Sequence, residues 1–176
     1  MKTSWRWLLL VLLVLAAAGL GYGVLSQPHL GGARWQEAQE DNVREAVFRR
    51  QIAEHRRYGE VCFLTISGRD ASAMAVFVAR RFQDASFVKS MAASQEGPAH
   101  SPMLVNTPTH NGYVDAHTGQ PALQFSTGAV EWTSDVRAEV SGDGSIAMES
   151  GNGGIYTVVW NGHRWNVTRY QMQVMF

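Results

Sequence analysis

Three residues in the middle of the chain, His110, Asp115 and His117, are a clustered set of the side-chain types that bind metal ions. Alternation along a strand would place Asp115 and His117 on one face, with His110 contributed by the adjoining loop. Imidazole and carboxylate groups bind Zn²⁺ and other divalent ions. The spacing matches no established metal motif, and polar loops commonly contain histidine. We therefore expect no bound metal and no cofactor, and we keep these three residues as the metal-ligand candidates.

The sole cysteine, Cys62, stands in the apolar segment Val61–Ile66. A reactive thiolate needs solvent exposure and a positively charged neighbour, and an apolar strand face supplies neither. The sequence thus predicts a buried core cysteine. A single cysteine also excludes an internal disulfide framework and a multi-cysteine metal site.

Serine and glycine patterns give no catalytic motif. Ser126, Ser141 and Ser145 lie near glycines, but no G-x-S-x-G sequence is present. The glycine-rich stretch 142–154 contains neither of two phosphate-binding motifs, G-x-x-x-x-G-K-[ST] and G-x-G-x-x-G followed by a helix. Two hairpin turns would explain its glycines.

Paired carboxylates for glycoside hydrolysis are not identifiable either. The predicted strands place three glutamates on a solvated sheet face, where a charge needs no catalytic role: Glu131, Glu139 and Glu149. The sequence predicts no catalytic residue, and we expect that the protein is not an enzyme.

The charge balance excludes one class of partner. Fifteen Lys and Arg residues equal fifteen Asp and Glu residues in the 176-residue chain, so the formal net charge is zero. A nucleic-acid-binding protein generally carries a basic excess. We therefore expect no nucleic-acid partner.

The amino terminus predicts a membrane segment. Trp7–Leu25 holds nineteen residues without a charge, close to the roughly 20 apolar residues that span a bilayer. Lys2 and Arg6 precede this segment and favour a cytoplasmic N-terminus. We expect a single-pass membrane protein that contacts the membrane through residues 7–25, with the rest of the chain on the extracytoplasmic side, periplasmic or extracellular.

A cleaved signal peptide is the alternative interpretation of the same segment. Ala16, Ala17 and Ala18 form a small-residue cleavage site, and cleavage there would give a secreted protein. The apolar segment continues to Leu25, which favours the anchor. The predicted organisation is an anchor or signal peptide over 1–25, a linker over 26–33 and an α+β domain over 34–176.

The first half of this domain alternates between helix and strand patterns. Helices are predicted over Trp35–Tyr58 and Ala71–Phe82, the second with Asp70 as its N-cap. Strands are predicted over Val61–Ile66 and Phe87–Met91. The polar segment Ala92–Asn111 reads as a long loop.

From Tyr113 onward the hydrophobic period becomes two, as in an antiparallel meander. Turns are predicted at residues 117–120, 127–128, 134–135, 141–144 and 151–154. Asn161-Gly162 predicts a two-residue hairpin turn that pairs Val158 with Trp165. The predicted fold class is α+β: an N-terminal transmembrane helix, then two helices packed on a curved antiparallel sheet that ends in a long β-hairpin.

Four segments carry a resemblance to known proteins: REAVFRRQ (44–51), FLTISGRDAS (63–72), VEWTSD (130–135) and YTVVWNGHRWNV (156–167). They resemble a group of bacterial extracytoplasmic α+β proteins that has no activity to carry over. Helices on a curved sheet also resemble NTF2-like or cystatin-like domains at the level of fold. Fold alone does not imply function.

Together these features predict a non-enzymatic, membrane-anchored extracytoplasmic module that mediates protein binding or assembly, for example as an accessory subunit of a membrane complex. The protein partner is unidentified. A small-ligand-binding domain is the first alternative, with its pocket between the helices and the sheet. A metal-dependent hydrolase that uses His110, Asp115 and His117 is the second.

Overall fold

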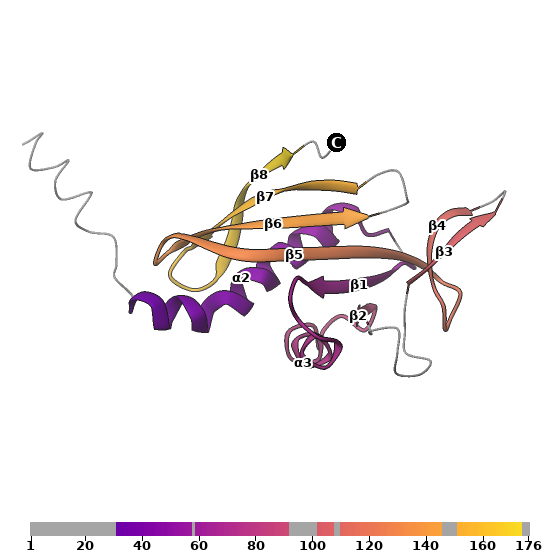
Figure 1. Ribbon diagram of the computed structural model, residues 1–176, viewed down its shortest axis with the longest axis horizontal. Coiled ribbons are helices and arrows are strands. Elements are labelled where there is room, and N and C mark those ends of the chain that lie inside the picture. Colours follow the sequence, from indigo (N-terminus) through magenta and orange to yellow (C-terminus); the bar gives the residue numbers. More distant parts are fainter. Residues whose placement is uncertain (1–30, 58, 92–101, 108–109, 146–150, 174–176) are drawn as a thin grey trace, which may run out of the picture.

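The computed structural model describes residues 31–57, 59–91, 102–107, 110–145 and 151–173. The chain forms two helices and eight strands over these ranges, and the fold is α+β (Figure 1). In chain order the elements are α2 (Gly32–His55), β1 (Val61–Ile66), α3 (Ala71–Arg81), β2 (Val88–Ser90), β3 (Pro102–Thr107), β4 (His110–Asp115), β5 (Pro121–Ser134), β6 (Arg137–Ser145), β7 (Gly151–Trp160) and β8 (Trp165–Gln173).

The predicted membrane segment, residues 7–25, lies outside the described residues. Within the ranges given above, no helix combines the length and the apolar composition that crossing a membrane requires.

The sheet is mixed, so the prediction of a wholly antiparallel sheet was wrong. Its strand order is β2-β1-β5-β6-β7-β8, with β4 also paired to β5 and β3 to β4. Strand β1 runs parallel to both β2 and β5. The reason is the connection through α3, which crosses back over the sheet before β2 begins and so makes β1 and β2 run in the same direction. The strands from β5 to β8 form the predicted antiparallel meander.

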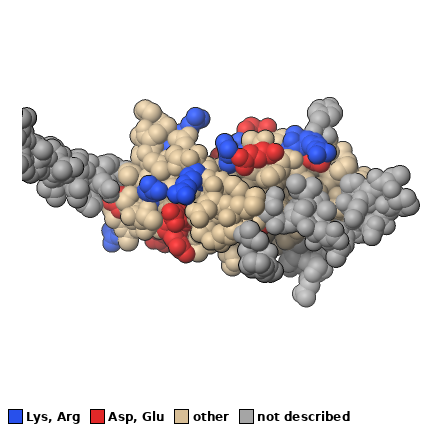
Figure 2. Space-filling view, turned by 90° about the horizontal axis from the view of Figure 1, so that it is seen from above, with Lys and Arg blue, Asp and Glu red and all other residues tan. Residues whose placement is uncertain are grey.

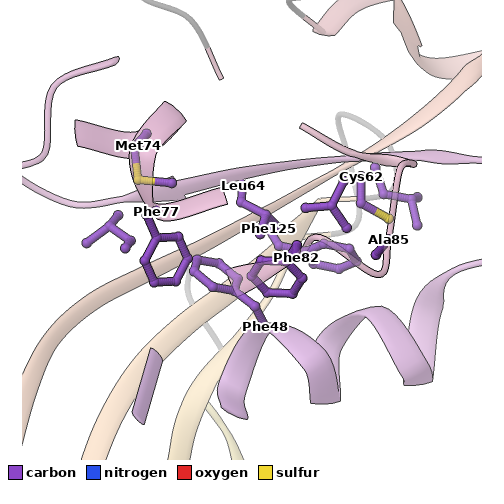
Figure 3. Close-up of a cluster of buried hydrophobic side chains, with 11 residues drawn as sticks. Phe48, Cys62, Leu64, Met74, Phe77, Phe82, Ala85 and Phe125 are labelled. Carbon is purple, nitrogen blue, oxygen red and sulfur yellow. The ribbon is translucent and has the colours of Figure 1, made fainter. Parts of the chain in front are cut away.

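Both helices pack against the same face of the sheet. One hydrophobic cluster joins Phe48 of α2 and Phe77 of α3 to Leu64 of β1 and Phe125 of β5. Figure 3 shows Phe48 reaching from α2 toward Phe77, Phe82 and Phe125. The rings of Phe48 and Phe77 meet edge to face, with centroids 6.0 Å apart.

A second cluster lies between the middle of α2 and the sheet. Val43 and Val47, both fully buried, contact strands β6 to β8 there. Helix α2 therefore belongs to both clusters, with Phe48 in the first and Val43 and Val47 in the second.

The two helices differ from their predicted limits by a few residues. Helix α3 ends at Arg81, and Asp70 is its N-cap as predicted, because its carboxylate accepts the N–H of Ala73 at 2.7 Å. Helix α2 ends at His55, earlier than the predicted Tyr58. Arg56 is extended there, and its guanidinium lies over the Phe87 ring, 3.5 Å from the centroid.

The glycine-rich segments are strands rather than turns. Gly142 and Gly144 lie inside β6, Gly154 lies inside β7, and Thr127-Gly128 forms an irregularity within β5. A Cβ on Gly142 would lie 3.0 Å from both Gln51 Nε2 and Tyr156 Cε2. These glycines are explained by the close approach of side chains to the sheet.

The prediction of a loop over residues 92–111 is also partly wrong. Strand β3 occupies Pro102–Thr107, and His110 begins β4, with Thr107 opposite His110. Residues 92–101 and 108–109 lie outside the described ranges. Strand β2 confirms the predicted strand at 87–91, with narrower limits.

The β7–β8 hairpin has the predicted faces but a different register. Trp160 lies opposite Trp165, and Val158 lies opposite Val167. The turn spans four residues because Asn161 Oδ1 accepts the backbone N–H groups of His163 and Arg164, with Gly162 at φ 96°. From the turn to Val158 the register is shifted by two residues, which keeps each side chain on its face, and the aromatic side chains remain in the core.

Candidate functional site

A groove of about 660 Å³ lies between one flank of α2 and the β7–β8 hairpin. The helix side of the groove carries residues spaced three, four or seven apart, which a helix places on one flank. The hairpin side carries residues from the last position of β7 to the third position of β8. The groove is lined by Gln39, Asn42, Glu45, Ala46, Arg49, Arg50, Trp160, His163, Arg164, Trp165, Asn166 and Val167.

Two tryptophans from the hairpin form the aromatic part of this groove. The rings of Trp160 and Trp165 have centroids 5.7 Å apart. The indole N–H of Trp165 donates to Gln39 Oε1 at 3.0 Å, and this bond links the strand to the helix across the groove. Trp35 packs edge to face on Trp160 at 6.0 Å, and Trp132 packs in the same way on Trp165 at 5.4 Å. The tryptophans are therefore fixed in place by their neighbours.

The arginines on the helix side are paired with carboxylates. Arg49 lies 2.8 Å from Glu45 and 3.1 Å from Asp84, and Arg50 lies 2.5 Å from Glu54. The bond to Arg49 holds the pKa of Asp84 below its usual range, and the bond to Asp84 raises the pKa of Arg49. The Arg49–Asp84 pair links α2 to the segment that follows α3, whereas the other two pairs lie within α2. Together they neutralise most of the charge on this wall.

The hairpin side of the groove is basic. His163 and Arg164 are both exposed. Within the described part of the chain, Arg164 has no carboxylate within ion-pair distance. The segment from Trp160 to Gln173 contains a further basic residue, Arg169, and no acidic residue. Figure 2 shows basic and acidic side chains side by side on one face of the molecule. The hairpin is thus a local basic surface beside the aromatic groove.

A second cavity, of about 420 Å³, lies against strands β1, β5 and β6. The strand register places Thr65, Ser126 and Asp143 in one row across these strands, and Ser141 lies nearby. A serine nucleophile needs a neighbouring base. No histidine is among the residues that line this cavity. The side chain of Ser145 lies outside the described residues.

Two of the three metal-ligand candidates lie at opposite ends of a strand, and the third lies in the turn that follows it. His110 begins β4 and Asp115 ends it, whereas His117 lies in the following turn, so Asp115 and His117 do not share a strand face. Asp115 is buried, and its carboxylate accepts the His117 backbone N–H at 3.0 Å and the Thr118 hydroxyl at 2.9 Å. This carboxylate therefore has a structural role in the turn.

The side chain of His110 lies outside the described part of the structure. Among the side chains that are described, no group of three His, Cys, Asp or Glu is placed to hold a metal ion. The metal site stays a prediction.

Cys62 lies where the sequence predicted, in the core beneath the helices. Its side chain is fully buried in the cluster shown in Figure 3. Burial raises the pKa of the thiol to about 12. The thiolate form, which is the reactive form, is thus strongly disfavoured near neutral pH.

The predicted outward glutamates lie on β5 and β6 as expected. Glu131 is exposed, and it lies opposite the half-buried Glu139 in the strand register. Glu149 lies outside the described residues.

The groove itself was missed by the sequence reasoning. Its two walls come from residues 39–50 and 160–167, which are more than one hundred positions apart. The composition of the hairpin segment does, however, distinguish it from the rest of the chain. The hairpin segment combines two tryptophans with basic residues and no acidic residue, whereas most basic residues of α2 have a glutamate four positions away.

Comparison of the sequence with protein-family models and with curated proteins gave no match, and comparison of the structure with solved structures gave none either. The resemblance to bacterial extracytoplasmic proteins therefore stays a prediction that rests on the four segments quoted above.

Proposed function

We propose that this protein is a membrane-anchored extracytoplasmic module that binds another protein and has no enzymatic activity of its own. Residues 7–25 would hold it in the membrane, with the N-terminus in the cytoplasm. The groove between α2 and the β7–β8 hairpin would receive the partner. The module would act as an accessory subunit of a membrane complex.

The observation that carries this proposal is the composition of the groove. It combines the half-buried ring of Trp160 with the guanidinium of Arg164, which has no carboxylate partner among the described residues. Tryptophan and arginine are among the residue types most enriched at the energetic centres of protein interfaces. The tryptophans are already held in place by ring contacts and by the bond to Gln39, so binding would not have to order them.

A small ligand is the second candidate for the same groove. Its volume of about 660 Å³ falls within the range of small-molecule sites. A thermal-shift screen distinguishes this candidate, since a ligand that binds the native state raises the unfolding temperature.

The test of the protein-binding proposal is affinity purification of the full chain, tagged at its C-terminus, from native membranes in mild detergent. We expect a stoichiometric protein partner that is retained by the wild type and lost from Arg164→Glu. Arg137→Glu is the matched control, because Arg137 is also exposed but does not line the groove. A chain that always purifies alone, or a partner that both variants retain equally, would contradict the proposal.

A further inference from the structure

We infer that the segment bound by this groove is an extended, acidic stretch of the partner that adds to the sheet as a new strand along β8. This inference rests on the proposed function and specifies the chemistry of the partner. Three observations carry it: the free edge of β8, the position of the groove beside that edge, and the charge of the hairpin.

Strand β8 is at the edge of the sheet. Among the described residues it pairs with β7 on one side and with no strand on the other. The edge of a sheet presents backbone N–H and C=O groups that can pair with a strand from another chain. Such strand addition is a common way for proteins to recognise an extended peptide.

The hydrogen bonds at the turn show which backbone groups are available. Asn161 donates its N–H to Arg164 O across the hairpin, whereas Trp160 donates its N–H to Val136 O, on the side of β6. Hydrogen-bonded and non-hydrogen-bonded pairs alternate along an antiparallel ladder. Trp165 and Val167 are therefore at non-hydrogen-bonded positions with respect to β7. Their backbone N–H and C=O groups point away from β7, toward the free edge.

The groove lies beside these same residues. Trp165, Asn166 and Val167 form its β8 wall, and the flank of α2 forms the other. A strand added here would have the helix on one side of it and the edge of β8 on the other. Main-chain hydrogen bonds would supply affinity, and the side chains that alternate into the groove would contact Trp160 and Trp165.

The charge of the hairpin selects the occupant. Arg164 and Arg169 flank the available positions, and His163 lies next to Arg164. A second copy of this chain, paired through its own β8, would bring more arginines and no acidic residue to the same edge. An acidic segment of a different protein provides the complementary charge.

The test selects peptides of about nine residues, the length of β8, from a random displayed library against the full chain in detergent micelles. We expect enrichment of Asp and Glu in the selected peptides. The best peptide is then labelled, and its binding is measured by fluorescence anisotropy. Arg164→Glu should weaken binding by about tenfold or more, and Arg137→Glu should leave it within about twofold.

Backbone pairing is tested on the peptide itself, so that the fold of the protein is not disturbed. N-methylation of alternate amides removes the donors on one edge of the peptide. We expect that one of the two alternating patterns abolishes binding and that the other preserves most of it. On the protein side, Val167→Pro removes one available N–H, and its fold is checked by circular dichroism.

The contrary results distinguish failure of this inference from failure of the proposed function. Selected peptides that lack acidic residues, or that tolerate both methylation patterns, would overturn strand addition by an acidic segment. If the native partner is still lost from Arg164→Glu, the proposed function survives that result. Self-association of the chain that Val167→Pro abolishes, without peptide binding, would assign this edge to a second copy and would also overturn the inference.

Discussion

Burial decides the chemistry of Cys62 at the scale of single residues. The thiol is fully buried, and its pKa is raised to about 12. We expect no reaction of the native protein with a thiol reagent at mildly alkaline pH, and complete reaction after unfolding in urea. The measurement is the rate of thiol labelling with and without denaturant. Rapid labelling of the native protein would show that this part of the core opens readily.

A second prediction for single residues concerns the stability of the folded protein at alkaline pH. Burial raises the pKa of Tyr156 from 10.0 to about 12, as it raises that of Cys62 from 9.0 to about 12. Both groups are neutral when protonated, and the folded state holds their protons more tightly than the unfolded state does. Their contribution to stability is therefore complete below about pH 9 and is lost as the pH rises toward about 12.

The free energy of unfolding should fall by about 1.4 kcal/mol per pH unit for each group that is ionised in the unfolded chain only. Urea unfolding over this pH range measures it. Tyr156→Phe should make the curve shallower above about pH 10. An unchanged slope in this variant would show that Tyr156 titrates alike in the folded and unfolded chains.

Close packing of strands against rings gives a prediction at the scale of elements. A Cβ added to Gly154 would contact the Tyr170 ring and would lie 2.6 Å from the carbonyl oxygen of Gln171. Because a backbone atom cannot move aside like a flexible side chain, Gly154→Ala should destabilise the protein by about 1–3 kcal/mol. Urea unfolding measures the change. Gln171→Ala, at an exposed position on the partner strand, should change the stability by less than about 0.5 kcal/mol.

The same glycine shows where inference from sequence reached its limit. The N-cap at Asp70 and the buried face of the final hairpin were predictable, because both depend on residues within a few positions of one another. The sequence pattern wrongly predicts turns at the glycines of β6 and β7, because the side chains that require these glycines belong to other elements: Gln51 of α2 faces Gly142, and Tyr170 of β8 faces Gly154.

Parallel pairing and the groove escaped prediction for a related reason. The pattern of Val61–Ile66 predicts a strand but does not specify its neighbours, and the α3 connection determines the direction of its pairing with β2. The candidate site requires α2 to lie beside β8. No local pattern in either segment records that contact.

At the scale of the whole molecule, α2 joins the two hydrophobic clusters. Phe48 packs in the cluster with α3, whereas Val43 and Val47 pack in the cluster that contains Trp165. Loss of one cluster should therefore also destabilise the other, through α2. We expect that Phe48→Ala lowers the stability by about 3–5 kcal/mol.

Tryptophan fluorescence provides the measurement, because four tryptophans pack in or against the second cluster and none packs in the cluster of Phe48: Trp35, Trp132, Trp160 and Trp165. Replacement of Trp5 and Trp7 by Phe removes the remaining signal. The fluorescence transition should shift together with that of circular dichroism. Val76→Ala, at an exposed position, is the control. A fluorescence transition that Phe48→Ala leaves unchanged would mean that the two clusters unfold independently.

The position of β1 between β2 and β5 also has a consequence for the order of events during synthesis. Val61 lies opposite Ala122, about sixty residues further along the chain, so this pairing must wait until β5 has been made. Until then the uncharged segment VCFLTI lacks one of its two neighbouring strands, and such apolar strands are prone to aggregate. The strands from β5 to β8 pair with near neighbours in sequence and can form quickly. We therefore expect the carboxyl-terminal meander to form first, so that β5 covers the exposed edge of β1 only after the later part of the chain has been synthesised.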